Sequence, residues 1–398
     1  MLKYYRCSTK VIKDGIKMKH SKALSLLLSF IIVFSVCTFS GARLSLSDEQ
    51  NICVQEALSS YLLGHMSWGV KSMGLDKLQK KLEESGKELP EVKVAVVDSG
   101  INTSNRYVKG RYTDDGYNFI DKNTDIEDSN YHGTMVSGII ADATSSNVKV
   151  LPLKVNNKNG TGYMSNVSKA IYYAIDHNAD VINLSLSAED PNHSIKVLDD
   201  AIEAAVKKGI VVVVASGNQS ADANDRYPAN KDNVLTITSV DKNNNIGENA
   251  NTGSCVDFAL PGVSITAPYK QIMFVDTGTS LAAPHAAAAA ALLKTCNKKL
   301  NQDDIKEILI KHSVDIGDEG FDNTYGWGMI NLADFDINST EREILSFDGK
   351  TVTLTDKNGN TNSIPFANYI NKSHYLLDVT DDGIVNAKDY AYLIRNYN

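Results

Sequence analysis

The sequence predicts an α/β fold in which a doubly wound parallel sheet is flanked by helices on both faces. Between Val92 and about Leu332, short β-branched runs alternate with longer segments of helical periodicity. The β-branched runs are almost continuously apolar, as strands covered on both faces must be. Strand–helix–strand order favours parallel pairing through right-handed crossovers. In such a sheet, ligands bind beyond the carboxyl ends of the strands.

Length and composition describe a soluble globular protein rather than a fibrous, disulfide-rich or multi-span membrane protein. The 398 residues are 42% hydrophobic and 22% charged, which is enough for a large core and more than one folding unit. The net charge of -8 argues against a nucleic-acid binder that works by bulk charge. Five cysteines without a C-x-x-C pair indicate neither a zinc site nor a dithiol centre.

The first 42 residues have the charge pattern of an export signal. Seven Lys or Arg residues and one Asp come first, and an uncharged run follows from Ala23 to Phe39. Ser40 and Ala42 are the small residues expected before a cleavage site after Ala42. Removal of residues 1–42 is therefore favoured over their retention as a membrane anchor. Translation from Met18 would give a more compact signal. We expect a secreted or cell-surface protein that keeps no stable membrane span.

Five apolar runs are predicted as strands of the sheet. They are VKVAVVD (92–98), VKVLPLKV (148–155), VINLSLS (181–187), IVVVVAS (210–216) and VLTITSV (234–240). One helix is predicted where Ile195, Leu198 and Ile202 repeat at helical spacing, and another over the alanine-rich stretch from Ser280 to Lys294. Pro284 is expected in the first turn of that second helix, which places Ser280 at or next to its N-cap.

Changes in composition divide the chain into five segments. Turn signals at Asp348-Gly349 and Asn358-Gly359 separate short strand patterns after the α/β domain. The predicted segments are the signal peptide (1–42), a short pro-segment or linker (43–64), the α/β domain (65–338), a small β linker (339–372) and a C-terminal repeat (373–398).

Four polar residues lie at predicted strand ends or helix starts. Asp98 and Asn218 follow apolar strands, whereas His132 and Ser280 begin helical patterns. Singly, each is an ordinary turn, cap or core residue. Together they supply what acyl transfer needs, namely a nucleophile, a base, a carboxylate that orients the base, and oxyanion donors. We assign these roles to Ser280, His132, Asp98 and Asn218, with the Ser280 N–H as the second donor.

The blocks VAVVDSGI, HGTMVSGIIA, ASGN and GTSLAAPH, in that order, closely resemble the motifs of subtilisin-like serine proteases. The resemblance runs from about Trp68 to YGWGMINLADF (325–335). It implies a subtilisin-like fold for the α/β domain, and an endopeptidase that cleaves polypeptides through an acyl-enzyme on Ser280 without a cofactor. It also implies that His285, within the last block, is a buried structural residue.

The resemblance further implies where a peptide would bind. The family holds its substrate extended between two edge strands, whose main-chain groups supply affinity. Ser187 stands where the family usually has glycine and would narrow the pocket, and Arg226 at the pocket floor would favour a small or acidic side chain. An arginine turned to solvent is the alternative. The residues that match the substrate strands and pocket are Gly160, Thr161, Gly162, Ser185, Leu186, Ser187, Ala215, Ser216, Gly217 and Arg226.

Departures from the family pattern limit what carries over. The segment ATSSNVKVLPLKV is shorter than in calcium-stabilised members, so their strong calcium loop is not expected. The segment 43–64 is too short for the folded inhibitory propeptide of many secreted relatives. Cys255 and Cys296 would lie where disulfides persist, and both a bridge and two buried thiols fit the sequence.

The C-terminal repeat has the spacing of an EF-hand-like calcium loop followed by a helix. In DVTDDGIVNAKD (378–389), oxygen-bearing side chains occupy loop positions 1, 3, 5, 9 and 12, and Gly383 permits the sharp turn. The segment resembles one repeat of a dockerin. Dockerins carry two repeats, so calcium binding is favoured over docking to a cohesin-like or cell-surface partner, and a solvated acidic turn is the alternative. The expected ligands are Asp378, Thr380, Asp382, Asn386 and Asp389, with the carbonyl of Ile384.

Two other functions fit the same residues. One is a narrow processing protease that trims a leader peptide from its partner. The other is a catalytically idle surface module that docks through residues 373–398. The specificity of cleavage distinguishes the first from a general endopeptidase, and the reactivity of Ser280 distinguishes the second.

Overall fold

The computed structural model describes residues 67–189, 195–340, 342–356, 361–372, 374–380 and 384–397, all within the compact unit Gln55–Asn398. The expected signal peptide and the segment 43–64 lie outside the described residues. None of the helices in the described ranges is long and apolar enough to cross a membrane.

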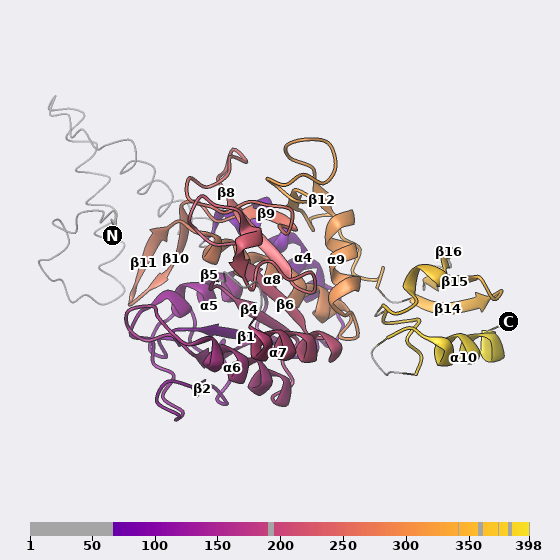
Figure 1. The fold of residues 1–398 in the computed structure, drawn as a ribbon, viewed down its shortest axis with the longest axis horizontal. Helices are drawn as coiled ribbons and strands as arrows, with labels where there is room; N and C mark the ends of the chain where they lie inside the picture. The colour runs from indigo at the N-terminus through magenta and orange to yellow at the C-terminus, as the bar shows by residue number, and fades with distance from the viewer. Residues whose placement is uncertain are drawn as a thin grey trace, which may run out of the picture. The chain divides into compact units, whose positions relative to one another are not determined.

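A seven-stranded parallel sheet forms the centre of the α/β domain (Figure 1). Each pair of neighbouring strands is parallel, which confirms the predicted architecture. The edge strands β2 and β9 were not predicted from the apolar runs. In spatial order the strands are β2 (Tyr117–Asn118), β3 (Val148–Lys154), β1 (Val92–Asp98), β4 (Val181–Leu184), β6 (Val211–Ala215), β8 (Leu235–Val240) and β9 (Phe258–Pro261).

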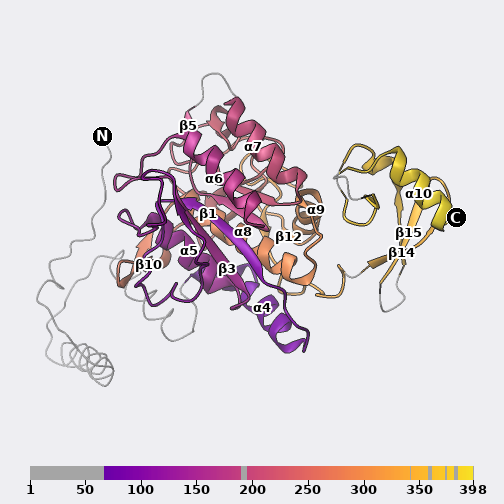
Figure 2. The same ribbon diagram turned by 90° about the horizontal axis from the view of Figure 1, so that it is seen from below.

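Helices cover both faces of the sheet, because alternate residues of each strand point to opposite sides. Val94 and Val96 of β1 belong to one apolar core, whereas Ala95 and Val97 belong to the other. The second core is covered by α6 (Met164–Asp176) and α7 (Lys196–Lys207), which lie side by side in Figure 2. The first contains residues of α3 (Trp68–Ser72), α4 (Leu75–Glu84), α5 (His132–Ala143), α8 (Thr279–Cys296) and α9 (Gln302–Lys311).

Helix α8 is buried along most of its length, because small alanine side chains let it pack closely against β4, β6, β8 and β9. It begins at Thr279, with Gly278 as its N-cap. Pro284 therefore lies in the second turn, and the expectation of a first-turn proline was wrong. Ser280 is the second helical residue, one position further inside the helix than expected.

Shorter elements complete the α/β domain. The hairpin β10–β11 leads directly into α8 and packs against α5. Strand β5 follows β4 in the chain and pairs with β7, which follows β6. These elements are β5 (Ala188–Glu189), a 3-10 turn (Ala223–Asp225), β7 (Arg226–Tyr227), β10 (Ile265–Tyr269), β11 (Ile272–Asp276), β12 (Ser313–Val314) and β13 (Met329–Ile330).

The C-terminal residues have a small apolar core of their own, which includes Phe347, Leu354 and Leu393. Three antiparallel strands form a sheet, and α10 packs on it. Asp382 and Gly383 of the expected calcium loop lie outside the described residues. The elements are β14 (Arg342–Phe347), β15 (Thr351–Asp356), β16 (Thr361–Pro365), a 3-10 turn (Phe366–Tyr369) and α10 (Ala387–Tyr397).

Candidate active site

The carboxyl ends of β1, β4 and β6 meet at one edge of the sheet, because neighbouring strands are parallel. Asp98 is the last residue of β1. Ser185 follows β4 directly, and Asn218 follows β6 after two further residues. The N-termini of α5 and α8 bring His132 and Ser280 to the same edge. The structure thus brings together the four residues to which acyl-transfer roles were assigned.

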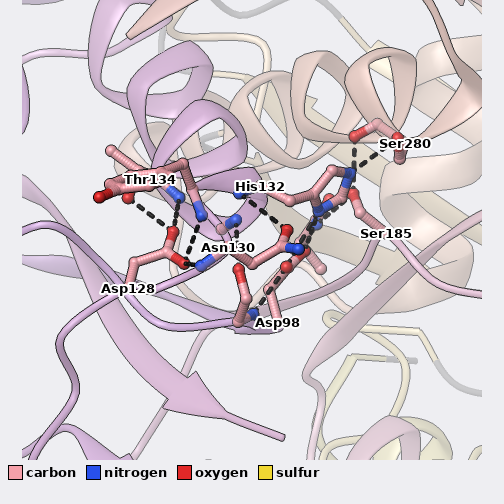
Figure 3. Close-up of polar contacts among 11 residues, drawn as sticks. Asp98, Asp128, Asn130, His132, Thr134, Ser185 and Ser280 are labelled. Carbon is pink, nitrogen blue, oxygen red and sulfur yellow. Dashed lines mark hydrogen bonds and ion pairs between the residues drawn. The ribbon is translucent and has the colours of Figure 1, made fainter. Parts of the chain in front are cut away.

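Asp98, His132 and Ser280 form a continuous hydrogen-bonded series (Figure 3). His132 Nδ1 lies 2.9 Å from both carboxylate oxygens of Asp98, and His132 Nε2 lies 2.9 Å from Ser280 Oγ. The Asp98 carboxylate is 1% exposed and can only accept, so Nδ1 carries the proton. The lone pair of Nε2 therefore faces the serine hydroxyl, as a base that removes its proton requires.

Opposing influences set the pKa of His132. Burial lowers this pKa, but the charge of Asp98 and its hydrogen bond, with smaller contributions from Asp128 and Asp276, raise it to about 9. The side chain is 31% exposed, and water there screens part of this attraction. Because the imidazole accepts a proton only when it is neutral, hydrolysis would be fastest at alkaline pH.

Two cross-links hold the start of α5 against the loop that follows β1. The Gly133 N–H donates to Ser99 Oγ at 2.9 Å, and the Asn102 N–H donates to Thr134 Oγ1 at 2.9 Å. Gly133 has no room for a Cβ, which would collide with the Gly100 carbonyl oxygen. The glycine after His132 therefore permits the close approach that keeps the imidazole beside Asp98.

Pro284 allows a further contact, which fixes the position of Ser280 itself. Proline has no N–H, so the carbonyl four residues earlier, that of Ser280, lacks its helical partner. The hydroxyl of Ser185 donates to this carbonyl at 2.8 Å (Figure 3). Asn183 Nδ2 donates to the same hydroxyl at 2.9 Å. These two hydrogen bonds fix the end of β4 to Ser280.

Asn218 is placed beside Ser280 by the first residue of α8. Its Oδ1 accepts from the Thr279 N–H at 2.9 Å, which leaves its amide Nδ2 as a donor. A Cβ at Gly278 would lie 3.3 Å from Ser280 Oγ and 3.4 Å from Asn218 Nδ2, so both atoms border one small space. The Ser280 N–H belongs to the first turn of α8, whose N–H groups have no partner within the helix. The arrangement can bind an oxyanion.

The residues expected to bind substrate lie around this edge. Gly162 makes an antiparallel bridge with Asn156, and the exposed residues 160–162 form the end of that turn rather than a regular strand. Residues 185–187 follow β4, and 215–217 end β6. A Cβ at Gly217 would lie 3.2 Å from Ser187 Oγ, so these two segments face each other closely. Arg226 is half-buried on β7, which pairs with β5.

Asn251 is a functional support that no sequence pattern indicated. It is fully buried, and its Oδ1 accepts from the N–H groups of Gln219 and Ala221. Its Nδ2 donates to the Ser216 carbonyl, and its own carbonyl accepts from the Ser216 hydroxyl. Asn251 therefore fixes the loop that carries Asn218 from both sides.

His285 is fully buried in α8. Its Nδ1 donates to the Leu281 carbonyl at 2.9 Å, so its Nε2 accepts from the Ser67 hydroxyl at 2.7 Å. Burial lowers the pKa of His285 to about 4, which keeps it neutral and suits a structural role.

Two other sequence expectations concern cysteines and metals. Cys255 and Cys296 are not joined by a disulfide in the structure, and burial raises the pKa of Cys255 to about 12. Within the described ranges, no group of three or more His, Cys, Asp or Glu residues could hold a metal ion.

A serine hydroxyl, an imidazole and a buried carboxylate, hydrogen-bonded in this order at the carboxyl edge of an α/β sheet, are the arrangement found in serine hydrolases, which include the serine-type endopeptidases. The sequence profile described as "Subtilase family" matches residues 90–328, more than half of the chain. The chain belongs to the subtilase family, as its motifs predicted.

Individual relatives agree with this assignment. The chain is 32% identical over 249 residues to the minor extracellular protease Epr of Bacillus subtilis (strain 168); the match covers 60% of this chain but 37% of that protein. It is 31% identical over 277 residues to subtilisin DY of Bacillus licheniformis, covering 67% of this chain and 96% of that protein.

Solved structures show the same fold. A cold adapted subtilisin-like serine proteinase superposes with a TM-score of 0.55 and 28% identity, covering 61% of this chain and 89% of that one. A lanthipeptide protease superposes with a TM-score of 0.62, covering 68% and 94% of the two chains. At 24% identity, the latter similarity concerns the fold alone.

Proposed function

We propose that this subtilase is a secreted endopeptidase that hydrolyses peptide bonds of polypeptides through an acyl-enzyme on Ser280. The observation that carries the proposal is the unbroken series Asp98–His132–Ser280, with both steps at 2.9 Å. Secretion is supported by the export-like charge pattern of residues 1–42 and by similarity to a protein named as an extracellular protease.

The mechanism follows from the positions of the donors and acceptors. Ser280 Oγ attacks the scissile carbonyl carbon while its proton passes to His132 Nε2. Asp98 stabilises the resulting imidazolium, and Asn218 Nδ2 and the Ser280 N–H bind the oxyanion. When the C–N bond breaks, His132 returns the proton to the leaving amine. Water activated by the same imidazole then releases the acid, and no cofactor takes part.

The pocket residues support a preference for small side chains before the scissile bond. Ser187 Oγ lies opposite Gly217, which reduces the space between the two pocket walls. A peptide library digested by the enzyme should be cut at many sites, mostly after small residues. Ser187→Gly should extend cleavage to larger side chains. The contribution of Arg226 stays a prediction.

Mass spectrometry of the digested library tests this specificity. Cleavage only within one tight motif would favour the processing protease that trims leader peptides. Equal cleavage after small and large residues by the wild type would contradict the narrowed pocket.

For the C-terminal loop we propose calcium binding by Asp378, Thr380, Asp382, Asn386 and Asp389 with the carbonyl of Ile384. The support is the all-oxygen donor set and the position of the loop's last carboxylate. Asp389 is fully buried, and its carboxylate accepts from the N–H groups of Thr380 and Asn386 at 3.0 and 2.8 Å. Thr380 and Asn386 thus both bind a carboxylate that could also coordinate a cation. Docking of residues 373–398 to a cohesin-like partner stays a prediction.

Calcium should raise the unfolding temperature of the wild-type protein but not that of Asp378→Ala. Differential scanning calorimetry with and without excess chelator measures this difference. Asp348→Ala, which removes a turn aspartate of the β14–β15 connection, is a control that should keep the calcium response. An unchanged wild-type transition with calcium would favour a solvated acidic turn.

A further inference from the structure

The residue before the proposed base has an unfavourable backbone conformation. Tyr131 is the N-cap of α5, and its φ of 76° lies in the left-handed region. Bulky side chains rarely adopt this conformation, because Cβ crowds the backbone there. Such a conformation persists only where the surrounding structure enforces it. Any relaxation at Tyr131 would rotate the chain directly before His132.

The side chain of Asp128 supplies that enforcement (Figure 3). One carboxylate oxygen accepts from the N–H groups of Asn130 and Tyr131 at 3.0 and 2.7 Å. The other accepts from the N–H and the hydroxyl of Thr134 at 2.9 and 2.7 Å. Asp128 is 1% exposed, so the carboxylate that accepts these four bonds is itself shielded from water. A single buried carboxylate therefore binds the backbone on both sides of His132.

The same contacts reach the loop that carries the other carboxylate. Thr134 Oγ1 donates to Asp128 and accepts from the Asn102 N–H, in the loop after Asp98. Asp128 thus fixes the position of His132 relative to its carboxylate partner as well as relative to Ser280. Neither Asp128 nor Thr134 contacts the reacting hydroxyl, so the effect passes through the backbone of α5.

Asp128 also adds negative charge near the imidazole. The carboxylates that act on His132 are Asp98 of β1, Asp128 in the loop before α5, and Asp276 of β11. Across the turn, the Lys270 ammonium lies 5.2 Å from the centre of the Tyr131 ring. Removal of the Asp128 charge would leave two carboxylates to favour the imidazolium.

We propose that Asp128 is a positioning residue that holds the strained turn at Tyr131 and thereby aims His132 at Ser280. The proposal rests on the proposed function, because it assigns Asp128 to the same proton transfer. It predicts an effect on turnover rather than on substrate binding, and an effect on the pH profile that a purely structural residue would not have.

The first test is Asp128→Asn in the full-length enzyme. An amide replaces one acceptor oxygen by an NH₂ group, which cannot accept from an N–H group, so at least one of the four bonds is lost. We expect kcat per active site to fall about 10- to 100-fold, as for ångström-scale misplacement of a catalytic group, with KM little changed. The acid limb of the kcat/KM profile should move to lower pH, because the imidazolium loses a stabilising charge.

A second substitution separates positioning from general destabilisation. Asparagine tolerates the left-handed region better than tyrosine. Tyr131→Asn in the Asp128→Asn background should therefore restore part of kcat without restoring the acid limb. Asp241→Asn is the matched control, because Asp241 likewise accepts from turn N–H groups, those of Asn243 and Asn245 at 2.8 Å. It should leave kcat and the pH profile unchanged.

Active-site titration with a fluorophosphonate normalises every rate to the fraction of correctly folded enzyme. An Asp128→Asn enzyme with wild-type kcat per titrated site and an unmoved acid limb would overturn the proposal. If this variant does not accumulate, Thr134→Val removes the hydroxyl's bonds to Asp128 and to the Asn102 N–H but keeps the charge of Asp128. It should lower kcat less and leave the acid limb in place, and an unchanged kcat would equally overturn the proposal. Failure of the wild type itself to titrate would instead contradict the proposed function.

Discussion

Ser280→Ala is expected to lower kcat about 10⁶-fold while the protein stays folded. This size is the one known for loss of a triad member in subtilisin, a relative of this chain, and is not calculated from the present structure. The physical reason is that no other hydroxyl occupies the position 2.9 Å from His132 Nε2 among the described residues. Residual hydrolysis would come from the oxyanion donors and substrate binding alone.

A matched control distinguishes loss of the nucleophile from loss of the fold. Ser254 is exposed, and its hydroxyl donates to Asn224 Oδ1 at 3.2 Å. Ser254→Ala should therefore keep wild-type turnover. Circular dichroism should show the same unfolding transition for both variants within a few degrees. A folded Ser280→Ala protein that hydrolyses peptides at the wild-type rate would refute the assigned nucleophile.

Asn218→Ala is expected to lower kcat about 10²- to 10³-fold with little change in KM. This range, too, comes from the equivalent donor of subtilisin rather than from the present geometry. The hydrogen bond from the Thr279 N–H orients the Asn218 amide. The bond from Asn218 Nδ2 to the substrate's carbonyl oxygen would strengthen only when that oxygen becomes negative in the transition state. Steady-state kinetics on one peptide substrate separate the two parameters.

Two further variants sharpen this prediction. Asn218→Asp keeps the acceptor for Thr279 but removes the donor and adds negative charge, so it should be at least as slow as Asn218→Ala. Asn243→Ala, at an exposed turn position, should turn over substrate normally. Equal kcat for wild type and Asn218→Ala would show that another group binds the oxyanion.

The centre of the fold could be predicted because its strands are buried on both faces. The runs predicted for β1 and β3 match the observed strands to within one residue. Strand β9 escaped prediction because FALP is short and contains a proline, which is unusual within a sheet. Pro284 led to a wrong prediction of the start of α8, because this proline lies in the second turn. The carbonyl that it leaves without a helical partner, that of Ser280, accepts from the Ser185 hydroxyl instead.

The proposed reactive residues follow from sequence motifs, whereas the residues that support them do not. Asp98, His132 and Ser280 stand beside glycines and strand ends that are visible in the sequence. Asp128 and Asn251 look like ordinary loop residues there. Their functions depend on backbone N–H groups that reach them only in the folded chain. Such contacts follow from tertiary packing, which apolar periodicity does not specify.

The most direct test of the central claim is covalent labelling of the wild-type enzyme with a fluorophosphonate, followed by peptide mapping. The phosphonyl group should be found on Ser280 alone, because among the described residues only this hydroxyl faces a neutral imidazole held by a carboxylate. Labelling should vanish in Ser280→Ala and in His132→Ala. An unlabelled but folded wild type, or a label on another residue, would contradict the account.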